Sequence, residues 1–89
     1  MTAPPRADAL ALLNEYVHDP KLRIHALCVE GVMRYQARKH QEDEDLWGIV
    51  GLLHDIDYER FPNEHCTRTR DILAPRGYAE EVIRAAESH

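Results

Sequence analysis

The sequence has few cysteines and no long apolar run, and each absence excludes a class of protein. Cys28 and Cys66 form no CxxC pair and cannot cross-link a small secreted fold, so we expect a reduced, intracellular chain. The longest nearly apolar run, residues 46–53, is too short to cross a bilayer, and the N-terminus has no signal-peptide core. We therefore expect a cytoplasmic protein with no membrane partner.

Basic residues are also scarce relative to acidic ones. Lys and Arg number 11 against 16 Asp and Glu, which gives a formal net charge of -5. The arginines are scattered singly from Arg6 to Arg84, whereas nucleic-acid binding depends on clustered cations. No nucleic-acid polymer is expected as a partner.

The 89 residues leave room for one modest core, so we expect one domain over residues 1–89. A content of 44% hydrophobic and 30% charged residues is typical of a chain that folds. No segment alternates with period two over strand length, and we find no internal repeat. The predicted fold is all-α, a compact bundle of about five helices.

Apolar residues recur at helical spacing in the first half of the chain. Leu10, Leu13 and Val17 predict a first helix that ends at Asp19-Pro20. The same dipeptide opens a second helix, with Asp19 as the N-cap and Pro20 at the first helical position. The apolar stripe of that helix consists of Leu22, Ala26, Val29 and Met33.

The run LWGIVGLL predicts a central, buried helix that begins near Leu46, because it is apolar on all faces. Its glycines, Gly48 and Gly51, would let neighbouring helices approach closely. After a loop over residues 57–63, a fourth helix is predicted over residues 64–73, stopped by Pro75-Arg76-Gly77.

A fifth helix is predicted from near Ala79, with Val82, Ala86 and His89 on one face. The chain ends there without a capping signal, so the domain looks incomplete. Val82, Ala86 and the central helix are then expected to be partly uncovered. We expect self-association as a homo-oligomer, for which exchange of helices between protomers is one route.

His-Asp occurs twice, and the two copies have different settings. His18-Asp19 lies in a polar turn before a proline and is expected to cap a helix. His54-Asp55 follows the buried helix, where an unpaired charge is costly. Adjacent helical residues point about 100° apart, so this pair can converge on one ion only if the helix ends there. The alternative is a pair that caps the helix and bonds the backbone.

Three further histidines lie on separate predicted helices: His25 on the second, His65 on the fourth and His89 on the fifth. Each has an ordinary explanation alone, as a satisfied core residue, an exposed first-turn residue and a frayed end. Together, inward-facing histidines on several helices beside one carboxylate are how metal sites are built in helical bundles. The face expected to carry His25 along apolar surface also carries Cys28, Val29 and Val32.

His25, the segment GLLHDID and the later NEH and SH resemble the HD superfamily of metal-dependent phosphohydrolases, in its HDIG-type branch, over residues 22–89. The resemblance implies that His25, His54 and Asp55 bind a first metal, and that Asp55 bridges to a second one held by His65 and His89. It implies that His54 and Asp55 serve catalysis, the hydrolysis of a small phosphomonoester or phosphodiester, nucleotides included, by metal-activated water. Mn, Fe, Co, Ni or Zn suit such ligands, and Mg is also allowed.

The sequence departs from the family pattern at three points. The family closes its first site with a later aspartate that this chain does not reach. Asp57 replaces a glycine common in the family, and Glu59 stands where many members carry lysine. Because an acidic loop would repel phosphate, Arg60 or Arg68 is expected to bind the substrate.

Two alternatives to the hydrolase remain. The missing aspartate and the acidic loop also suit a catalytically inert helical interaction module that keeps the HD core. A di-iron oxygenase is the least favoured reading, since only a few HD-fold proteins oxidise small polyols.

Overall fold

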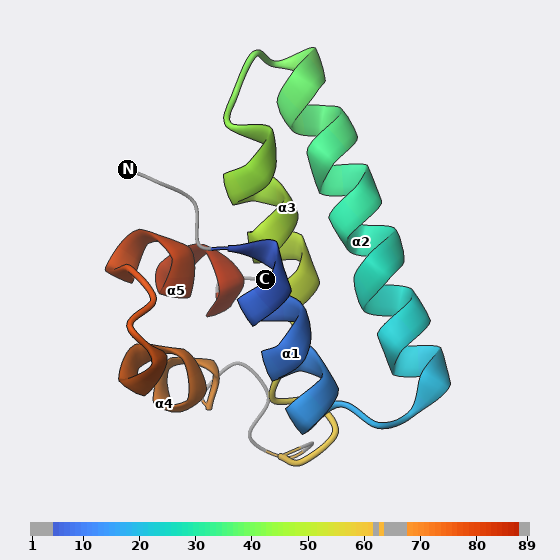
Figure 1. Ribbon diagram of the computed structural model, residues 1–89, viewed down its shortest axis with the longest axis vertical. Helices are drawn as coiled ribbons and strands as arrows, with labels where there is room; N and C mark the ends of the chain where they lie inside the picture. The colour runs from blue at the N-terminus through green and yellow to red at the C-terminus, as the bar shows by residue number, and fades with distance from the viewer. Residues whose placement is uncertain (1–4, 62, 64–67, 88–89) are drawn as a thin grey trace.

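The computed structural model describes residues 5–61, 63 and 68–87. Within these residues the chain forms helices and turns and no strand, which confirms the all-α prediction. None of the described helices is both long and apolar enough to span a membrane. The elements are α1 (Arg6–Tyr16), α2 (Pro20–Lys39), α3 (Glu44–Leu53), α4 (Thr69–Leu73), the 3-10 helix η2 (Ala74–Arg76) and α5 (Glu80–Glu87), as Figure 1 shows.

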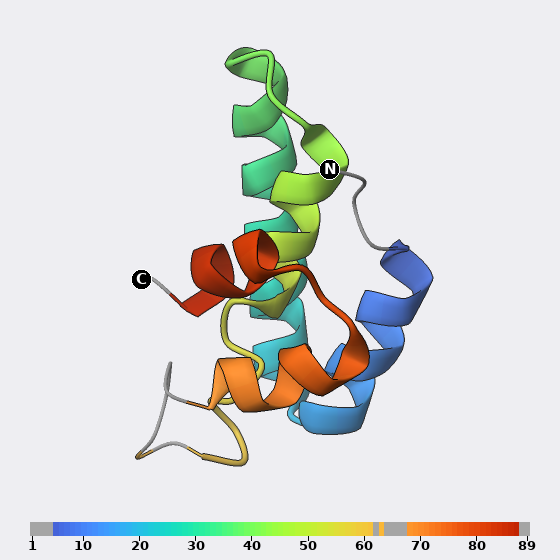
Figure 2. The ribbon, with the colours of Figure 1, turned by 90° about the vertical axis from the view of Figure 1, so that its left-hand side faces the viewer.

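Helix α3 is the centre of the bundle. It runs antiparallel to α2 along its whole length and also contacts α1 and α5 (Figures 1 and 2). Five residues of its apolar run are buried, so the prediction of a central helix is confirmed. Leu46, Trp47 and Val50 are only partly buried, as expected for a central helix that is partly uncovered. The core that surrounds it is made of Leu12, Leu13, Ile49, Leu52, Leu53, Ile56, Ile72, Leu73 and Ile83, among others.

Two glycines allow α2 and α3 to approach each other closely, as predicted. A Cβ atom on Gly51 would lie 3.0 Å from the Val29 carbonyl oxygen and 3.2 Å from Glu30 Cα, both backbone atoms that cannot turn away. A Cβ atom on Gly48 would lie 2.5 Å from Arg34 Nε. Because glycine has no side chain, α2 and α3, the helices that carry the candidate site, can lie close together at these two positions.

A buried carboxylate ties α1 and α3 to α2. Both oxygens of Glu30 accept from Arg6, at 2.7 and 3.0 Å, and one also accepts from Arg34 at 3.1 Å. Arg34 in turn donates to Asp45 at 2.8 Å. The hydrogen bond from Arg6, together with that from Arg34, outweighs the opposing effect of burial and holds the pKa of Glu30 below its ordinary value.

The N-terminal ends of the two long helices follow from local chemistry. The Asp19 carboxylate accepts from the Lys21 N–H at 2.9 Å, and Pro20 stands in the first turn, as predicted. Helix α3 starts at Glu44, two residues before the predicted Leu46. The reason is that the Asp43 carboxylate accepts from the Leu46 N–H and draws the acidic residues into the first turn.

The later helices differ in part from the prediction. Helix α4 is described from Thr69, whereas residues 64–67 of the predicted helix lie outside the described residues. It passes into η2 and stops at Gly77, whose φ of 82° is left-handed. Val82 and Ala86 are fully buried, because α5 packs against both α3 and α4, so the expectation that they are uncovered is wrong.

Candidate metal centre

The central helix ends just before the second His-Asp pair. Leu53 is the last residue of α3, and His54 and Asp55 begin a series of turns. The turns are tight: the Ile56 N–H donates to Leu53 O at 3.1 Å, and the Tyr58 N–H donates to Asp55 O at 3.0 Å. The condition for the two adjacent side chains to converge is therefore met.

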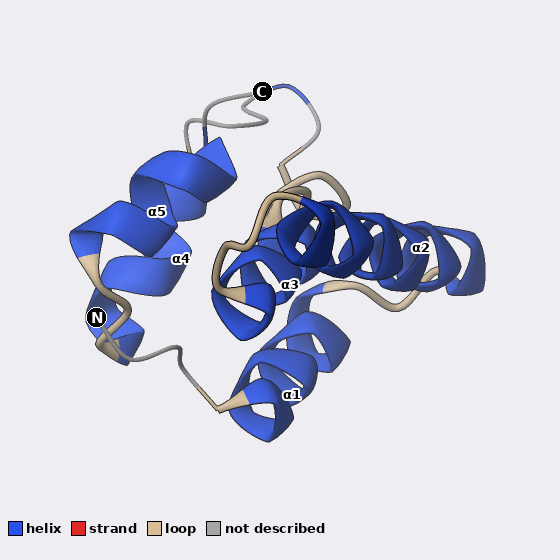
Figure 3. Ribbon diagram, turned by 90° about the horizontal axis from the view of Figure 1, so that it is seen from above, coloured by secondary structure: helices blue, strands red, loops and turns tan. Residues whose placement is uncertain are grey.

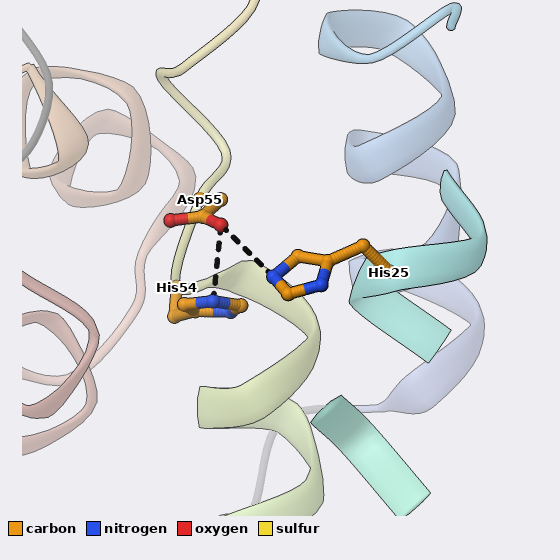
Figure 4. Close-up of side chains that lie close together, drawn as sticks. All are labelled: His25, His54 and Asp55. Carbon is orange, nitrogen blue, oxygen red and sulfur yellow. Dashed lines mark ion pairs between the residues drawn. The ribbon is translucent and has the colours of Figure 1, made fainter. Parts of the chain in front are cut away.

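The side chains of His25, His54 and Asp55 meet at the end of α3 (Figure 4). Nε2 of His54 lies 3.1 Å from Oδ2 of Asp55, and Nε2 of His25 lies 3.4 Å from the same oxygen. The two imidazole centroids are 5.4 Å apart. One ligand atom from each residue lies within 4.8 Å of the other two. The structure thus brings His25 of α2 next to His54 and Asp55 at the end of α3.

The orientation of the His54 ring is set by the helix that precedes it. Nδ1 of His54 lies 2.7 Å from the carbonyl oxygen of Gly51. Because a carbonyl can only accept, Nδ1 carries the proton, and Nε2 of a neutral ring presents a lone pair toward Asp55. A lone pair and a carboxylate oxygen at 3.1 Å repel each other unless a positive species lies between them. A proton or a metal cation meets that requirement.

The spacing of the donor atoms fits a metal ion. Metal–ligand bonds of about 2.1 Å place neighbouring ligand atoms about 3.0 Å apart in an octahedron and about 3.4 Å apart in a tetrahedron. The distances from Asp55 Oδ2 to Nε2 of His54 and of His25, 3.1 and 3.4 Å, lie at these values. A metal-ligating histidine commonly donates its other ring N–H to a backbone carbonyl, as His54 does here.

His25 is more exposed than predicted. Its side chain is 53% exposed, and Cys28 and Val32 beside it are also exposed. The prediction that this face lies along apolar surface is wrong, because the residues of α2 that are buried, Ala26, Glu30 and Ala37, lie on another side of the helix. His25 instead reaches round the edge of α2 to the end of α3. One side of the centre is therefore open to solvent.

The remaining predicted ligands, His65 and His89, lie outside the described residues. Among the residues that the structure does describe, no second group of three histidine, cysteine or acidic side chains gathers in this way. The role of the five predicted ligands in metal binding stays a prediction.

The two acidic residues after the motif are held by the fold. Asp57 is fully buried, and its carboxylate accepts from the Arg68 N–H at 3.3 Å, so the expectation that it forms part of an acidic, phosphate-repelling loop is wrong. Glu59 accepts from the backbone N–H groups of His18 and Asp19 at 2.8 and 2.7 Å. These two bonds lower the pKa of Glu59.

Sequence reasoning named Glu59 and Gly51 but missed the contacts through which they support the site. Glu59 fixes the loop that leads into α2, the helix of His25, and the carbonyl of Gly51 orients His54. Only the second contact had a local signal, since residue 51 lies one turn before His54. Glu59 and its partners are about 40 residues apart, and no local pattern joins them.

The two candidate substrate-binding arginines already have contacts. Arg60 donates to the Glu15 carbonyl oxygen at 3.1 Å, and its guanidinium lies 4.3 Å from the centroid of the Tyr16 ring. The guanidinium of Arg68 lies 5.4 Å from the centroid of the Phe61 ring. Substrate binding by either arginine stays a prediction.

Residues 22–89 match the family model of the HD domain. No curated protein and no solved structure gives a significant match to the chain. The family match includes all three residues that meet at the end of α3.

Proposed function

Because this chain belongs to the HD domain family, we propose that it is a metal-dependent phosphohydrolase that cleaves a small phosphomonoester or phosphodiester, with nucleotides among the candidates. The family implies a fold of the metal-dependent hydrolase type. The observation that carries the proposal is the convergence of the His25 and His54 Nε2 atoms on one oxygen of Asp55.

His25, His54 and Asp55 would hold one divalent transition ion, for which Mn, Fe, Co, Ni and Zn are the candidates, with Mg as a further option. Such an ion supplies Lewis acidity, which lowers the pKa of water and offsets charge on a phosphoryl oxygen. Three protein ligands are the number typical of catalytic sites, because they leave a position open. The exposed side of His25 provides the access that a substrate needs.

The chain's own groups prepare this centre in two ways. The Gly51 carbonyl keeps the His54 Nε2 lone pair directed at the centre. The tight packing of α2 against α3 at Gly51 holds His25 at a fixed distance from His54. Both devices limit the reorganisation needed when the ion and the substrate bind.

Of the two candidate arginines, Arg68 is better placed to bind the substrate phosphate. Its backbone N–H contacts Asp57, two residues after Asp55, and its guanidinium donates to the exposed carboxylate of Asp71 at 3.2 Å, whereas the side chain of Arg60 is directed toward α1. A guanidinium can bind a phosphate through two parallel hydrogen bonds. We therefore propose that Arg68 binds the substrate phosphate, with Arg60 as the second candidate.

Hydrolysis of p-nitrophenyl phosphate and bis(p-nitrophenyl) phosphate with added Mn²⁺, Co²⁺ or Ni²⁺ tests the proposal. We expect turnover that is lost on chelation and in Asp55→Asn but kept in His18→Ala, which changes a histidine of the other His-Asp pair. Stoichiometric metal binding without turnover of either ester would contradict the proposal. It would favour a catalytically inert helical interaction module.

A further inference from the structure

The first turns of α2, which carry His25, are the part of that helix that packing holds least. Ala26 is its first buried residue, and none of residues 20–25 is buried, although Leu22 among them is partly buried and contacts the core. Figures 1 and 3 show α2 at the edge of the bundle, beside α3 and away from α4 and α5. Helix ends without buried side chains open at a low cost in free energy. The position of His25 therefore depends on the polar contacts that hold the start of α2.

The carboxylate of Glu59 supplies two of these contacts. Its Oε1 accepts from the Asp19 N–H at 2.7 Å, and its Oε2 accepts from the His18 N–H at 2.8 Å. Asp19 is the N-cap of α2, and in many helices a Glu or Gln at the third helical position accepts from the N-cap N–H. That position is Leu22 here, which cannot accept. Glu59 therefore supplies, from 40 residues away, the acceptor that α2 itself lacks.

The loop that carries Glu59 is firmly joined to Asp55. The Tyr58 N–H donates to Asp55 O at 3.0 Å, and the Phe61 N–H donates to Asp57 O at 2.9 Å, so hydrogen-bonded turns enclose Glu59. Asp57 is fully buried, which anchors these turns in the core. Glu59 therefore keeps a fixed position relative to Asp55.

We propose that Glu59 is a positioning residue of the metal centre: it joins the loop of Asp55 to the start of α2 and so holds His25 at the distance from Asp55 that a shared ion requires. This role rests on the proposed function, in which His25 and Asp55 bind the same ion. Glu59 is not itself a ligand, because each of its carboxylate oxygens already accepts from a backbone N–H. Its charge makes both hydrogen bonds stronger than bonds to a neutral acceptor.

A second, indirect route joins the same loop to α2 through α1. Arg60 donates to the Glu15 carbonyl oxygen at 3.1 Å, which ties the loop to α1. Nε of Arg23 donates to the Val17 carbonyl oxygen at 2.6 Å, which ties α1 to α2. Because this route remains when Glu59 is replaced, loss of the Glu59 carboxylate should weaken metal binding without abolishing it.

Metal binding by Glu59→Ala tests this role. Isothermal titration calorimetry should find the affinity for Zn²⁺ or Co²⁺ lowered by about 10-fold, as for the loss of an outer-shell partner. The visible absorption of bound Co²⁺ depends on the arrangement of its ligands, so it should also change, which a loss of stability alone would not cause. Glu59→Gln keeps one carbonyl oxygen that can accept from a backbone N–H, so it should bind metal more tightly than Glu59→Ala.

Asp43→Ala is the matched control, because Asp43 accepts from the Leu46 N–H at 3.0 Å and caps α3 at the end away from the metal centre. It should lose stability but keep the metal affinity and the Co²⁺ spectrum of the wild type. Asp19→Ala should keep them too, because the backbone N–H that Glu59 binds remains. Circular dichroism checks that each variant is folded.

Wild-type affinity and spectrum in Glu59→Ala would overturn the role of Glu59 and leave the metal centre in place. Equal losses in Glu59→Ala and Asp43→Ala, or in Glu59→Ala and Glu59→Gln, would also overturn it. A wild-type chain that binds neither ion would overturn it together with the metal centre. Metal binding with the expected losses but without turnover of either ester would contradict the phosphohydrolase alone, and the role of Glu59 would stand.

Discussion

The chain contains the dipeptide His-Asp twice, and the two copies lie in different structural surroundings. His18-Asp19 lies in an exposed loop, where the Asp19 carboxylate accepts from a backbone N–H and both backbone N–H groups of the dipeptide donate to Glu59. His54-Asp55 lies at the end of a buried helix, where its carboxylate faces two imidazole nitrogens. The dipeptide alone therefore does not define a site. The buried helix before it and a histidine from another helix do.

The largest expected difference between the two copies is in metal affinity. Asp55→Asn removes the charge of the oxygen that lies within 3.4 Å of both imidazole nitrogens. We expect the affinity for Zn²⁺ or Mn²⁺ to fall by more than about 100-fold, beyond the loss of an outer-shell partner. Isothermal titration calorimetry measures it. Asp19→Asn is the matched control, because asparagine also caps helices. Equal losses in both variants would remove the distinction between the copies.

His25→Ala sharpens the comparison, because His18-Asp19 has no described counterpart to His25. We expect the metal affinity to fall by about 100-fold. Without metal, the free energy of unfolding should change by less than about 0.5 kcal/mol, since the side chain is half exposed. Urea unfolding with and without metal separates the two effects. A large loss of stability in the metal-free protein would show that His25 is a packing residue.

Gly51→Ala tests whether the second copy depends on the approach of α2 to α3. The added methyl group would meet two backbone atoms of α2, so we expect a loss of about 1–3 kcal/mol in unfolding free energy and weaker metal binding. Gly31→Ala, on the same pair of helices, meets nothing within 4 Å and should stabilise by up to about 1 kcal/mol. Thermal unfolding of both variants at the same protein concentration compares them. Equal effects would contradict the close approach.

The smallest effect is expected at the first copy. Asp19→Ala removes the cap of α2 and should cost about 1 kcal/mol of stability while leaving metal affinity unchanged. Urea unfolding and calorimetry on the same sample provide both values. A clear loss of metal affinity would mean that the side chain of Asp19 also supports the centre.

Local chemistry explains which features of the fold could be predicted. The Asp19-Pro20 start of α2, the buried run of α3 and the close approach at Gly51 each depend on residues near in sequence or on the absence of a side chain. The meeting of His25 with His54-Asp55 was expected from helix periodicity combined with family resemblance.

The features that could not be predicted depend on which helix faces pack against one another. The burial of Asp57 and the exposure of His25 follow from packing on one side of a helix, which periodicity alone does not reveal. The bond of Glu59 to His18 joins residues 41 positions apart. The cover that α5 gives to its own apolar face depends on its angle against α3 and α4.

The metal content of the purified chain tests the central claim most directly. Plasma mass spectrometry after loading with Zn²⁺ or Mn²⁺ and dialysis should find at least one ion per chain in the wild type and in His18→Ala. His25→Ala should contain about one ion fewer. A wild-type chain without stoichiometric metal, or equal contents in His18→Ala and His25→Ala, would contradict a metal centre at the end of α3.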